Sequence, residues 1–295
     1  MSVQLAKRWS TFWFAPASPL NLGVCRVLFY GALLVFYIRY DYSELAHLPP
    51  ELWRPISFFR TFGLEAPSGA TMLTVQWLWR GTLLLSCLGV ATRVCTAASF
   101  VLGIYLIALP HNFARASHTD AVVVLTLAVM AMSHCGDAYS VDSWRRRRRA
   151  TVGAAQPSGE YTWPVRAVWL VFCLVFFAAG VAKLRASGLA WITSDQFSNL
   201  MLLATVDHAA LTTFGQVLGR YPRICSVLAG AAVVLEISAP LAVVSQRARL
   251  VIVPSLLAMR VGIRLLLGPS FIEFGICALF FVPWDRAFAD DRALT

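Results

Sequence analysis

"PVRAVWLVFCLVFFAAGVAKL", residues 164–184, is a nearly unbroken apolar run with a lysine next to its end. As one helix it would be about 31 Å long, at about 1.5 Å per residue, which is enough to cross a bilayer. Comparable runs predict eight spans, at about residues 22–38, 73–91, 94–110, 120–134, 164–184, 222–244, 249–267 and 270–284. We therefore expect an all-α fold, a polytopic transmembrane helical bundle that occupies residues 1–295 as a single domain.

The composition agrees with a membrane protein and argues against several soluble classes. The 295 residues are 58% hydrophobic and only 14% charged, which is too little charge to cover a soluble surface of this size. The net charge of +10 comes from arginines that lie mainly between the apolar runs, so it predicts topology and not nucleic-acid binding. The seven cysteines include no C-x-x-C pair, so we expect buried apolar residues and neither disulfides nor a metal site.

The basic residues also predict an orientation. With the N-terminus inside, the short inner segments hold the strongest positive bias, namely Lys7, Arg8, Arg93, Arg145–Arg149, Arg247, Arg249 and Arg286. Cytoplasmic segments of membrane proteins carry such an excess. We therefore expect a multi-pass protein of the cell membrane with both termini cytoplasmic. Residues 144–163 are interpreted as a flexible cytoplasmic linker whose arginines fix the topology and contact anionic membrane lipid.

Two of the predicted outer segments are too apolar for ordinary loops. Residues 48–62 are rich in Trp, Phe and Pro, and residues 194–218 open with Ser194 and Asp195, which predict a helix start, before an apolar stripe. Both are expected to be interfacial or re-entrant helices on the outer face. They would either roof a vestibule for a lipid-soluble ligand or only cover the membrane surface.

Several ionisable side chains fall inside the predicted spans, where each costs roughly 3 kcal/mol unless it is paired or hydrated. Arg80 is expected to have an acidic partner, Glu236 or Glu273. For both acids the alternative to a ligand-binding role is a purely structural ion pair with an arginine. Arg260 and Arg264 are four residues apart on one helix face, so an anion or a carboxylate should lie between them. Because the bases outnumber the acids, we expect water or a polar ligand inside the bundle. The candidate ligand-binding residues are Arg26, Arg80, Glu236, Arg260, Arg264 and Glu273.

Lys183 has two interpretations. It shares a helix face with Phe176 and Gly180, and the small residues before it let another helix, or a flat ligand, come close. A partly desolvated amine at the mouth of an apolar pocket can take a proton from a weak acid. The alternative is that Lys183 only reaches toward lipid headgroups. His118, at the entrance of the fourth predicted span, would hydrogen-bond a ligand oxygen or would be a surface histidine without a role.

Three stretches together, in order and spacing, resemble a known family. They are "NLGVCRVLFYGALL" (21–34), "ASHTDAVVVLTLAVMAMSHCGDAYSVDSWRRR" (116–147) and "FFAAGVAKLRASGLAW" (176–191). They resemble the HTTM family, the membrane domain shared with vitamin K-dependent γ-glutamyl carboxylase. The resemblance implies that Lys183 is a catalytic base that deprotonates a reduced naphthoquinone and starts its epoxidation, assisted by His118, in a lyase or oxidoreductase. The resulting strong base would take a proton from a glutamate.

The chain also departs from that pattern. It has Arg260 where the family has a histidine, Ala182 where the carboxylase has a second lysine, and it stops at Thr295 without the carboxylase's large extramembrane region. We therefore do not expect peptide carboxylation, but a quinone-sized pocket facing away from the cytoplasm. The family also resembles a multi-pass protein that matures a bacterial peptide toxin, which would place this chain in a bacterial inner membrane. The alternative hypothesis is a non-enzymatic membrane protein that binds or transports an anionic lipid, or assists the maturation of a secreted peptide.

Overall fold

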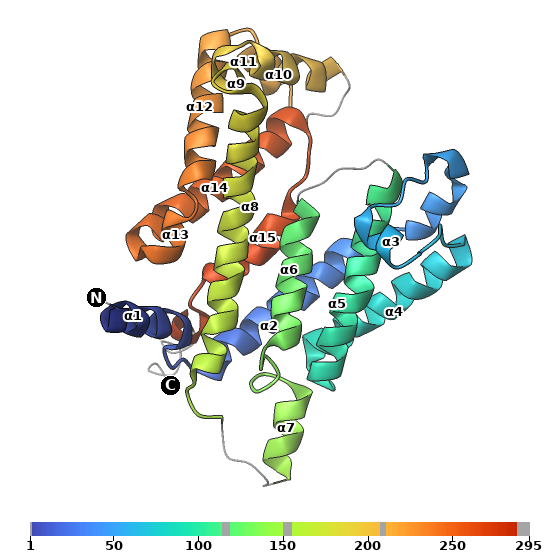
Figure 1. Ribbon diagram of the computed structural model, residues 1–295, viewed down its shortest axis with the longest axis vertical. Helices are drawn as coiled ribbons and strands as arrows, with labels where there is room; N and C mark the ends of the chain where they lie inside the picture. Colours follow the sequence, from blue (N-terminus) through green and yellow to red (C-terminus); the bar gives the residue numbers. More distant parts are fainter. Residues whose placement is uncertain (1, 114–118, 150–154, 207–210, 288–295) are drawn as a thin grey trace. The chain divides into compact units, whose positions relative to one another are not determined.

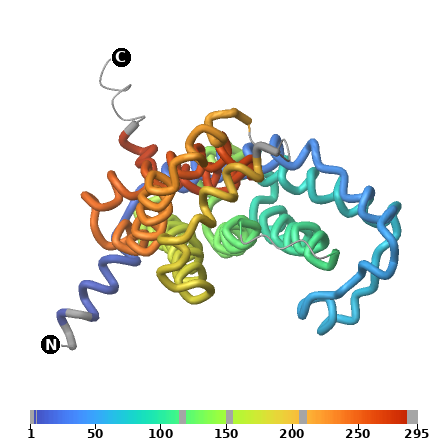
Figure 2. The backbone as a smooth tube through the Cα atoms, turned by 90° about the horizontal axis from the view of Figure 1, so that it is seen from above, coloured from blue at the N-terminus to red at the C-terminus, as the bar shows by residue number. Residues whose placement is uncertain are grey.

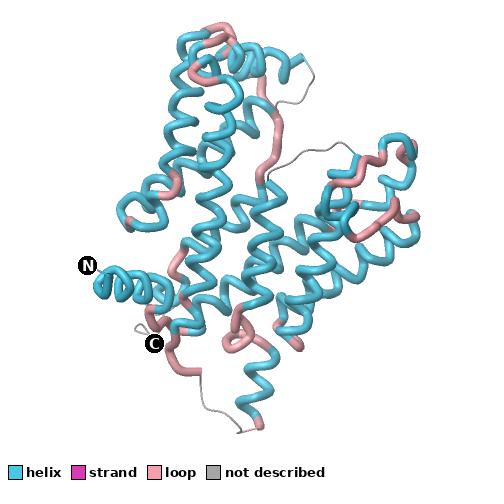
Figure 3. Tube along the Cα trace, in the orientation of Figure 1, coloured by secondary structure: helices cyan, strands magenta, loops and turns pink. Residues whose placement is uncertain are grey.

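The computed structural model describes residues 2–113, 119–149, 155–206 and 211–287. Within these ranges every regular element is helical, as Figures 1 and 3 show, which confirms the predicted all-α class. The chain forms two compact units, residues 1–168 together with 279–295, and residues 169–278. The boundary falls within helix α8 (Trp163–Ser187).

The first unit is built on four helices that pack in chain order. These are α2 (Pro19–Tyr37), α4 (Gly69–Leu88), α5 (Thr92–Ala108) and α6 (Thr119–Met132). Figure 2 shows the connection between α2 and α4 as an arc of short helical turns. The remaining elements are α1 (Ser2–Phe14), η1 (Tyr42–His47), η2 (Pro50–Leu52), α3 (Ser57–Thr61), η3 (Leu109–Phe113), α7 (Val141–Arg148), η4 (Gly159–Tyr161), η5 (Leu279–Phe281) and α16 (Trp284–Ala287).

The second unit is built from the later part of α8 and the helices that follow it. They are α9 (Ala190–Thr193), α10 (Gln196–Val206), α11 (Phe214–Leu218), α12 (Pro222–Ser238), α13 (Leu241–Val244), α14 (Gln246–Leu267) and α15 (Ile272–Ala278). Its core contains the fully buried rings of Phe172, Phe176 and Phe274. The ring centroid of Phe274 lies 4.4 Å from that of Phe176 and 5.7 Å from that of Phe172, so α15 packs closely against α8.

Within the described ranges, four helical segments are long and apolar enough to cross a membrane, Pro19–Tyr37, Thr92–Phe113, Gly159–Ser187 and Gln246–Leu267. Two shorter apolar helices, Thr119–Met132 and Ile272–Phe281, coincide with two more predicted spans. The predicted span 222–244 is instead divided, because α12 ends at Ser238 and Pro240 starts a separate turn. Proline lacks the N–H that would continue the helix. The membrane class is therefore supported, and the count of eight spans stays a prediction.

Part of the predicted linker 144–163 is helical. Residues 144–148 complete α7, which begins with a capping box in which Ser140 and Ser143 each accept a hydrogen bond from the other's backbone N–H. The segment 139–143 also passes very close to the end of α4. At Gly89 the backbone is left-handed, with φ at 70°, and a Cβ there would lie 2.3 Å from the Cβ of Ser140. Only glycine fits this turn.

The two predicted interfacial segments also contain helices. In residues 194–218, α10 begins at Gln196, whose backbone N–H donates to Ser194 Oγ, as the Ser-Asp signal predicted. Residues 48–62 contain η2 and α3, and their backbone is tied to η3 because Ile56 N–H donates to Asn112 Oδ1 at 2.9 Å. Both segments expose large apolar side chains, among them Leu48, Leu52, Phe62, Leu203, Phe214 and Val217.

Candidate functional site

The side chains of Lys183 and Glu236 form an ion pair between α8 and α12 in the second unit. Lys183 Nζ donates to Glu236 Oε1 at 2.6 Å and also contacts Oε2. The Glu236 side chain is 1% exposed and that of Lys183 is 25% exposed. The lysine is therefore held by a buried carboxylate, while part of its side chain stays accessible.

Gly180 explains why these two helices approach so closely. It lies one turn before Lys183, and a Cβ added there would be 3.0 Å from Glu236 Cβ and 3.0 Å from Ile237 Cγ1. Contacts that short are tighter than most Cβ contacts in proteins, so a larger residue at this position would require the facing atoms of α12 to shift. The small-residue face predicted before Lys183 is thus occupied by another helix, with Glu236 as the partner of the lysine.

Arg260 on α14 is the second cation beside Glu236. Its Nη2 lies 4.0 Å from Glu236 Oε1, and its side chain is only 8% exposed. The guanidinium carbon lies over three aromatic rings, 4.7 Å from the centroid of Phe176, 4.3 Å from Phe271 and 4.9 Å from Phe274. Aromatic faces attract a desolvated cation. Among the described residues, Nε and Nη2 of Arg260 have no hydrogen-bond partner.

These residues form one cluster, in which a buried carboxylate is shared by two cations. Arg260 would not be stable in an apolar site without its carboxylate and the three rings, because a buried charge is costly unless it is paired. Glu236 in turn is oriented by Lys183. The cluster can therefore hold a proton between Nζ and the carboxylate, and it places positive charge where an anionic group could bind.

The other predicted arginines engage backbone carbonyls of the chain itself. Arg26 is fully buried, and its guanidinium donates to the carbonyls of Ser86 and Cys87 at 2.5 Å, Tyr139 at 2.6 Å and Cys135 at 3.1 Å. The last carbonyls of a helix lack partners within it and carry partial negative charge. Arg26 thus closes the end of α4 and joins it to the segment before α7, and it has no exposed surface for a headgroup.

Arg80 likewise donates hydrogen bonds to backbone carbonyls at the end of α2. Its Nη2 donates to the carbonyls of Tyr37 at 3.2 Å, Ile38 at 2.9 Å and Tyr40 at 2.5 Å. Neither predicted acidic partner is among these contacts. Carbonyls at a helix end can satisfy a guanidinium without any countercharge.

Arg264 also differs from expectation. Arg264 is exposed and donates to the carbonyl of Gly268, which follows the end of α14. No anion is therefore needed between Arg264 and Arg260, although they are one turn apart. Glu273 is buried on α15, with 5% of the residue exposed.

His118 lies outside the described residues. Among the described histidines, His111 has its Nε2 2.9 Å from Asp120 Oδ2 in the first turn of α6. Across the ranges that the structure describes, no group of three or more His, Cys, Asp or Glu side chains is placed to hold a metal ion.

Asp142 is a residue whose role the sequence did not reveal. Its carboxylate accepts hydrogen bonds from Ala91 N at 3.1 Å, Thr92 N at 2.7 Å and Thr92 Oγ1 at 2.8 Å, so it caps the start of α5 from outside. Partial burial raises the pKa of Asp142, but these bonds and nearby Arg146 outweigh it and hold that pKa below its ordinary 3.8. The signal in the sequence was Ala91 at the start of α5. Alanine has no side chain that can cap a helix, so the cap had to come from another residue.

The sequence matches the HTTM domain over residues 14–265, a range that includes Lys183, Glu236 and Arg260. No match was found among curated proteins or among solved structures.

Proposed function

Because the chain belongs to the HTTM family, matched over residues 14–265, we propose that this membrane protein uses Lys183 as a base toward a quinol-like or other lipidic substrate. The observation that carries the proposal is the pair of Lys183 with Glu236, a carboxylate whose side chain is only 1% exposed. A lysine fixed by a buried acid while partly accessible is suited to moving protons. A reduced naphthoquinone is the substrate class that the family resemblance favours.

The proton is passed in two steps. First, the ammonium of Lys183 gives its proton to Glu236, whose Oε1 is 2.6 Å from Nζ. The free amine then takes a proton from the hydroxyl of the substrate, which leaves an ammonium and an oxyanion. Arg260, with Nη2 4.0 Å from Glu236 Oε1, supplies further positive charge near that oxyanion.

The proposal includes an orientation. The positive bias of the segments around Arg93, 145–149 and 247–249 favours a multi-pass topology with cytoplasmic termini and with Lys183 near the opposite, extracytoplasmic surface. Substrate would then enter from the lipid or from that outer side.

The test uses a lipid-soluble naphthol, a weak acid whose ionised form absorbs at longer wavelength. Full-length protein in lipid nanodiscs is titrated with the naphthol at neutral pH, and absorbance gives the ionised fraction of the bound probe. Lys183→Arg is the informative variant, because arginine can keep the ion pair with Glu236 but stays protonated and cannot act as a base. We expect the native protein to ionise the probe and Lys183→Arg to bind it without ionising it. Ionisation retained by Lys183→Arg would exclude the mechanism.

A second candidate function rests on Arg260. Its buried Nε and Nη2 lack hydrogen-bond partners among the described residues, which favours a non-enzymatic protein that binds or transports an anionic lipid or a secreted peptide. In that case mass spectrometry of gently purified protein should find a bound anionic lipid or peptide that Arg260→Gln loses and Lys183→Arg retains. A bound naphthoquinone would favour the first function instead.

A further inference from the structure

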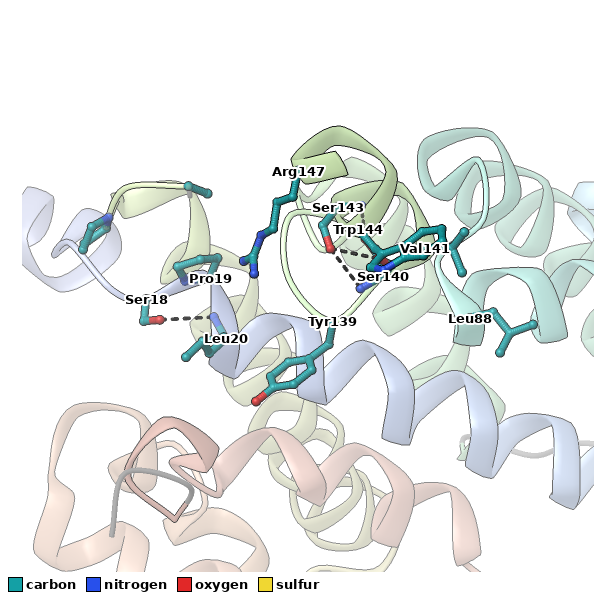
Figure 4. Close-up of a pocket in the computed structure, with 12 residues that line it drawn as sticks. Ser18, Pro19, Leu20, Leu88, Tyr139, Ser140, Val141, Ser143, Trp144 and Arg147 are labelled. Atoms are coloured by element: carbon teal, nitrogen blue, oxygen red, sulfur yellow. Dashed lines mark hydrogen bonds between the residues drawn. The ribbon is translucent and has the colours of Figure 1, made fainter. Parts of the chain in front are cut away.

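A second location in the first unit has the form of a ligand site. A pocket of about 850 Å³ lies between the start of α2, the end of α4 and helix α7. Its walls include Pro19, Leu20, Leu88, Tyr139, Trp144 and Arg147, which Figure 4 shows around the opening. None of these residues belongs to the Lys183 cluster, so the pocket does not depend on the proposed function.

The pocket lies at the level where membrane helices end. Pro19 is the first residue of α2, a helix of membrane-crossing length, and Leu88 is the last residue of its neighbour α4. The segment Thr92–Phe113, which also has the length and hydropathy to cross, begins four residues further on with helix α5. The start of α2, the end of α4 and α7 lie at the same end of the unit in Figure 1. A site here would face the headgroup region of the bilayer.

Its apolar side has the composition of a membrane interface. Leu88 is 50% exposed, Tyr139 50% and Trp144 51%, so three large apolar side chains remain accessible around one pocket. Trp and Tyr are enriched at the level of lipid headgroups, since their rings are apolar and their N–H or O–H remains hydrated. This side would contact the glycerol backbone and the first carbons of acyl chains.

The polar side carries Arg147, a cation for which no ion pair is found among the described residues. Arg147 extends from α7 toward Ser18, Pro19 and Leu20 in Figure 4. Within the part of the chain that the structure describes, Arg147 makes no ion pair, whereas Arg146 binds Asp137 at 2.9 Å and Arg148 lies 4.0 Å above the Trp144 ring. Ser18 Oγ accepts from Leu20 N–H, which leaves its own hydrogen free to donate to an anion.

We propose that this pocket binds an anionic phospholipid, with the headgroup phosphate on Arg147 and the glycerol region against Leu88, Tyr139 and Trp144. Charge complementarity selects an anionic ligand, because residues 145–149 are five consecutive arginines. The apolar wall and the place at the helix ends select a membrane lipid over a free anion. The bound lipid would join α7 to α2 and α4, and so hold the arginine-rich helix against the bundle.

The test measures binding of phosphatidylglycerol to the full-length protein in detergent, by native mass spectrometry and by the shift in melting temperature. Ligand that binds only the folded state raises the melting temperature in proportion to occupancy. Phosphatidylglycerol should stabilise the protein, while phosphatidylcholine and inorganic phosphate should not. Stabilisation by inorganic phosphate equal to that by the lipid would overturn the proposal in favour of a simple anion site.

Arg147→Gln and Arg149→Gln form a matched pair. Both remove one positive charge from the same run, but Arg149 follows the end of α7 and does not line the pocket. Arg147→Gln should weaken phosphatidylglycerol binding by roughly tenfold or more, since it loses a charged hydrogen bond. Arg149→Gln should cost no more than the roughly fivefold loss from one surface arginine. Equal losses in the two variants would show a diffuse charge effect and contradict the site.

Discussion

Glu236 is bound by Lys183 at a place where Gly180, one turn earlier on α8, lets the backbone of α12 come into contact. The ion pair and the helix crossing therefore depend on each other. The carboxylate can be buried because the lysine reaches it, and the lysine reaches it because no side chain stands between the helices. This relation makes the size of residue 180 a determinant of the chemistry at Lys183.

The first prediction concerns that size. Gly180→Val should lower the melting temperature and abolish naphthol ionisation, because its Cβ alone would lie 3.0 Å from atoms of Glu236 and Ile237. Overpacking of this kind costs roughly 1–3 kcal/mol. The matched control is Gly262→Ala on α14, where a Cβ meets nothing within 4 Å and alanine favours the helix by roughly 1 kcal/mol. Equal stability of the two variants would contradict the role given to Gly180.

The second prediction concerns the buried charges. Glu236→Gln should destabilise the protein by roughly 3–5 kcal/mol, because it leaves the ammonium of Lys183 and the guanidinium of Arg260 without their shared carboxylate. The double variant Lys183→Met/Glu236→Gln should be more stable than Glu236→Gln alone. Unfolding followed by tryptophan fluorescence in a double-mutant cycle gives the coupling between the two positions. Strictly additive changes in unfolding free energy would mean that the interaction between Lys183 and Glu236 contributes nothing to stability.

The third prediction separates Arg26 from a ligand-binding role. Arg26→Met should cost roughly 3 kcal/mol or more, since it leaves four backbone carbonyls without their donor. No added ligand should restore that stability. Arg39→Met serves as control, because Arg39 is exposed just after α2. If Arg26→Met melted like the control, the closure of α4 by this residue would be refuted.

The fourth prediction is a pH dependence at Asp142. Its pKa is lower in the folded chain than its ordinary 3.8, so the carboxylate stabilises the fold above that ordinary value. This contribution is lost as the pH falls through the lowered pKa. Between about pH 5 and pH 2 the melting temperature of the native protein should therefore fall more steeply than that of Asp142→Asn. Parallel curves for the two proteins would show that the cap carries no charge-dependent stability.

The helices and the membrane class were predictable from the sequence, but the partners of the buried cations were not. Arg26 and Arg80 were expected to need a ligand or an acid, and the structure gives both of them carbonyls at helix ends. The positions of charged residues in a sequence do not show which backbone carbonyls will accept their hydrogen bonds, because every residue has a carbonyl. The partner of Lys183 was equally hidden, since Glu236 is 53 residues away along the chain.

What the sequence determined by itself was the helical membrane class, the family, and the positions at which ionisable residues enter apolar segments. These follow from local composition and order, because hydrophobicity and helix length act along the chain. The tertiary structure alone decided that Glu236 lies between Lys183 and Arg260, that Asp142 caps a helix it does not belong to, and that Arg147 faces a pocket. Each of these depends on how closely helices distant in sequence approach one another, and that distance is set by packing at single residues such as Gly180 and Gly89.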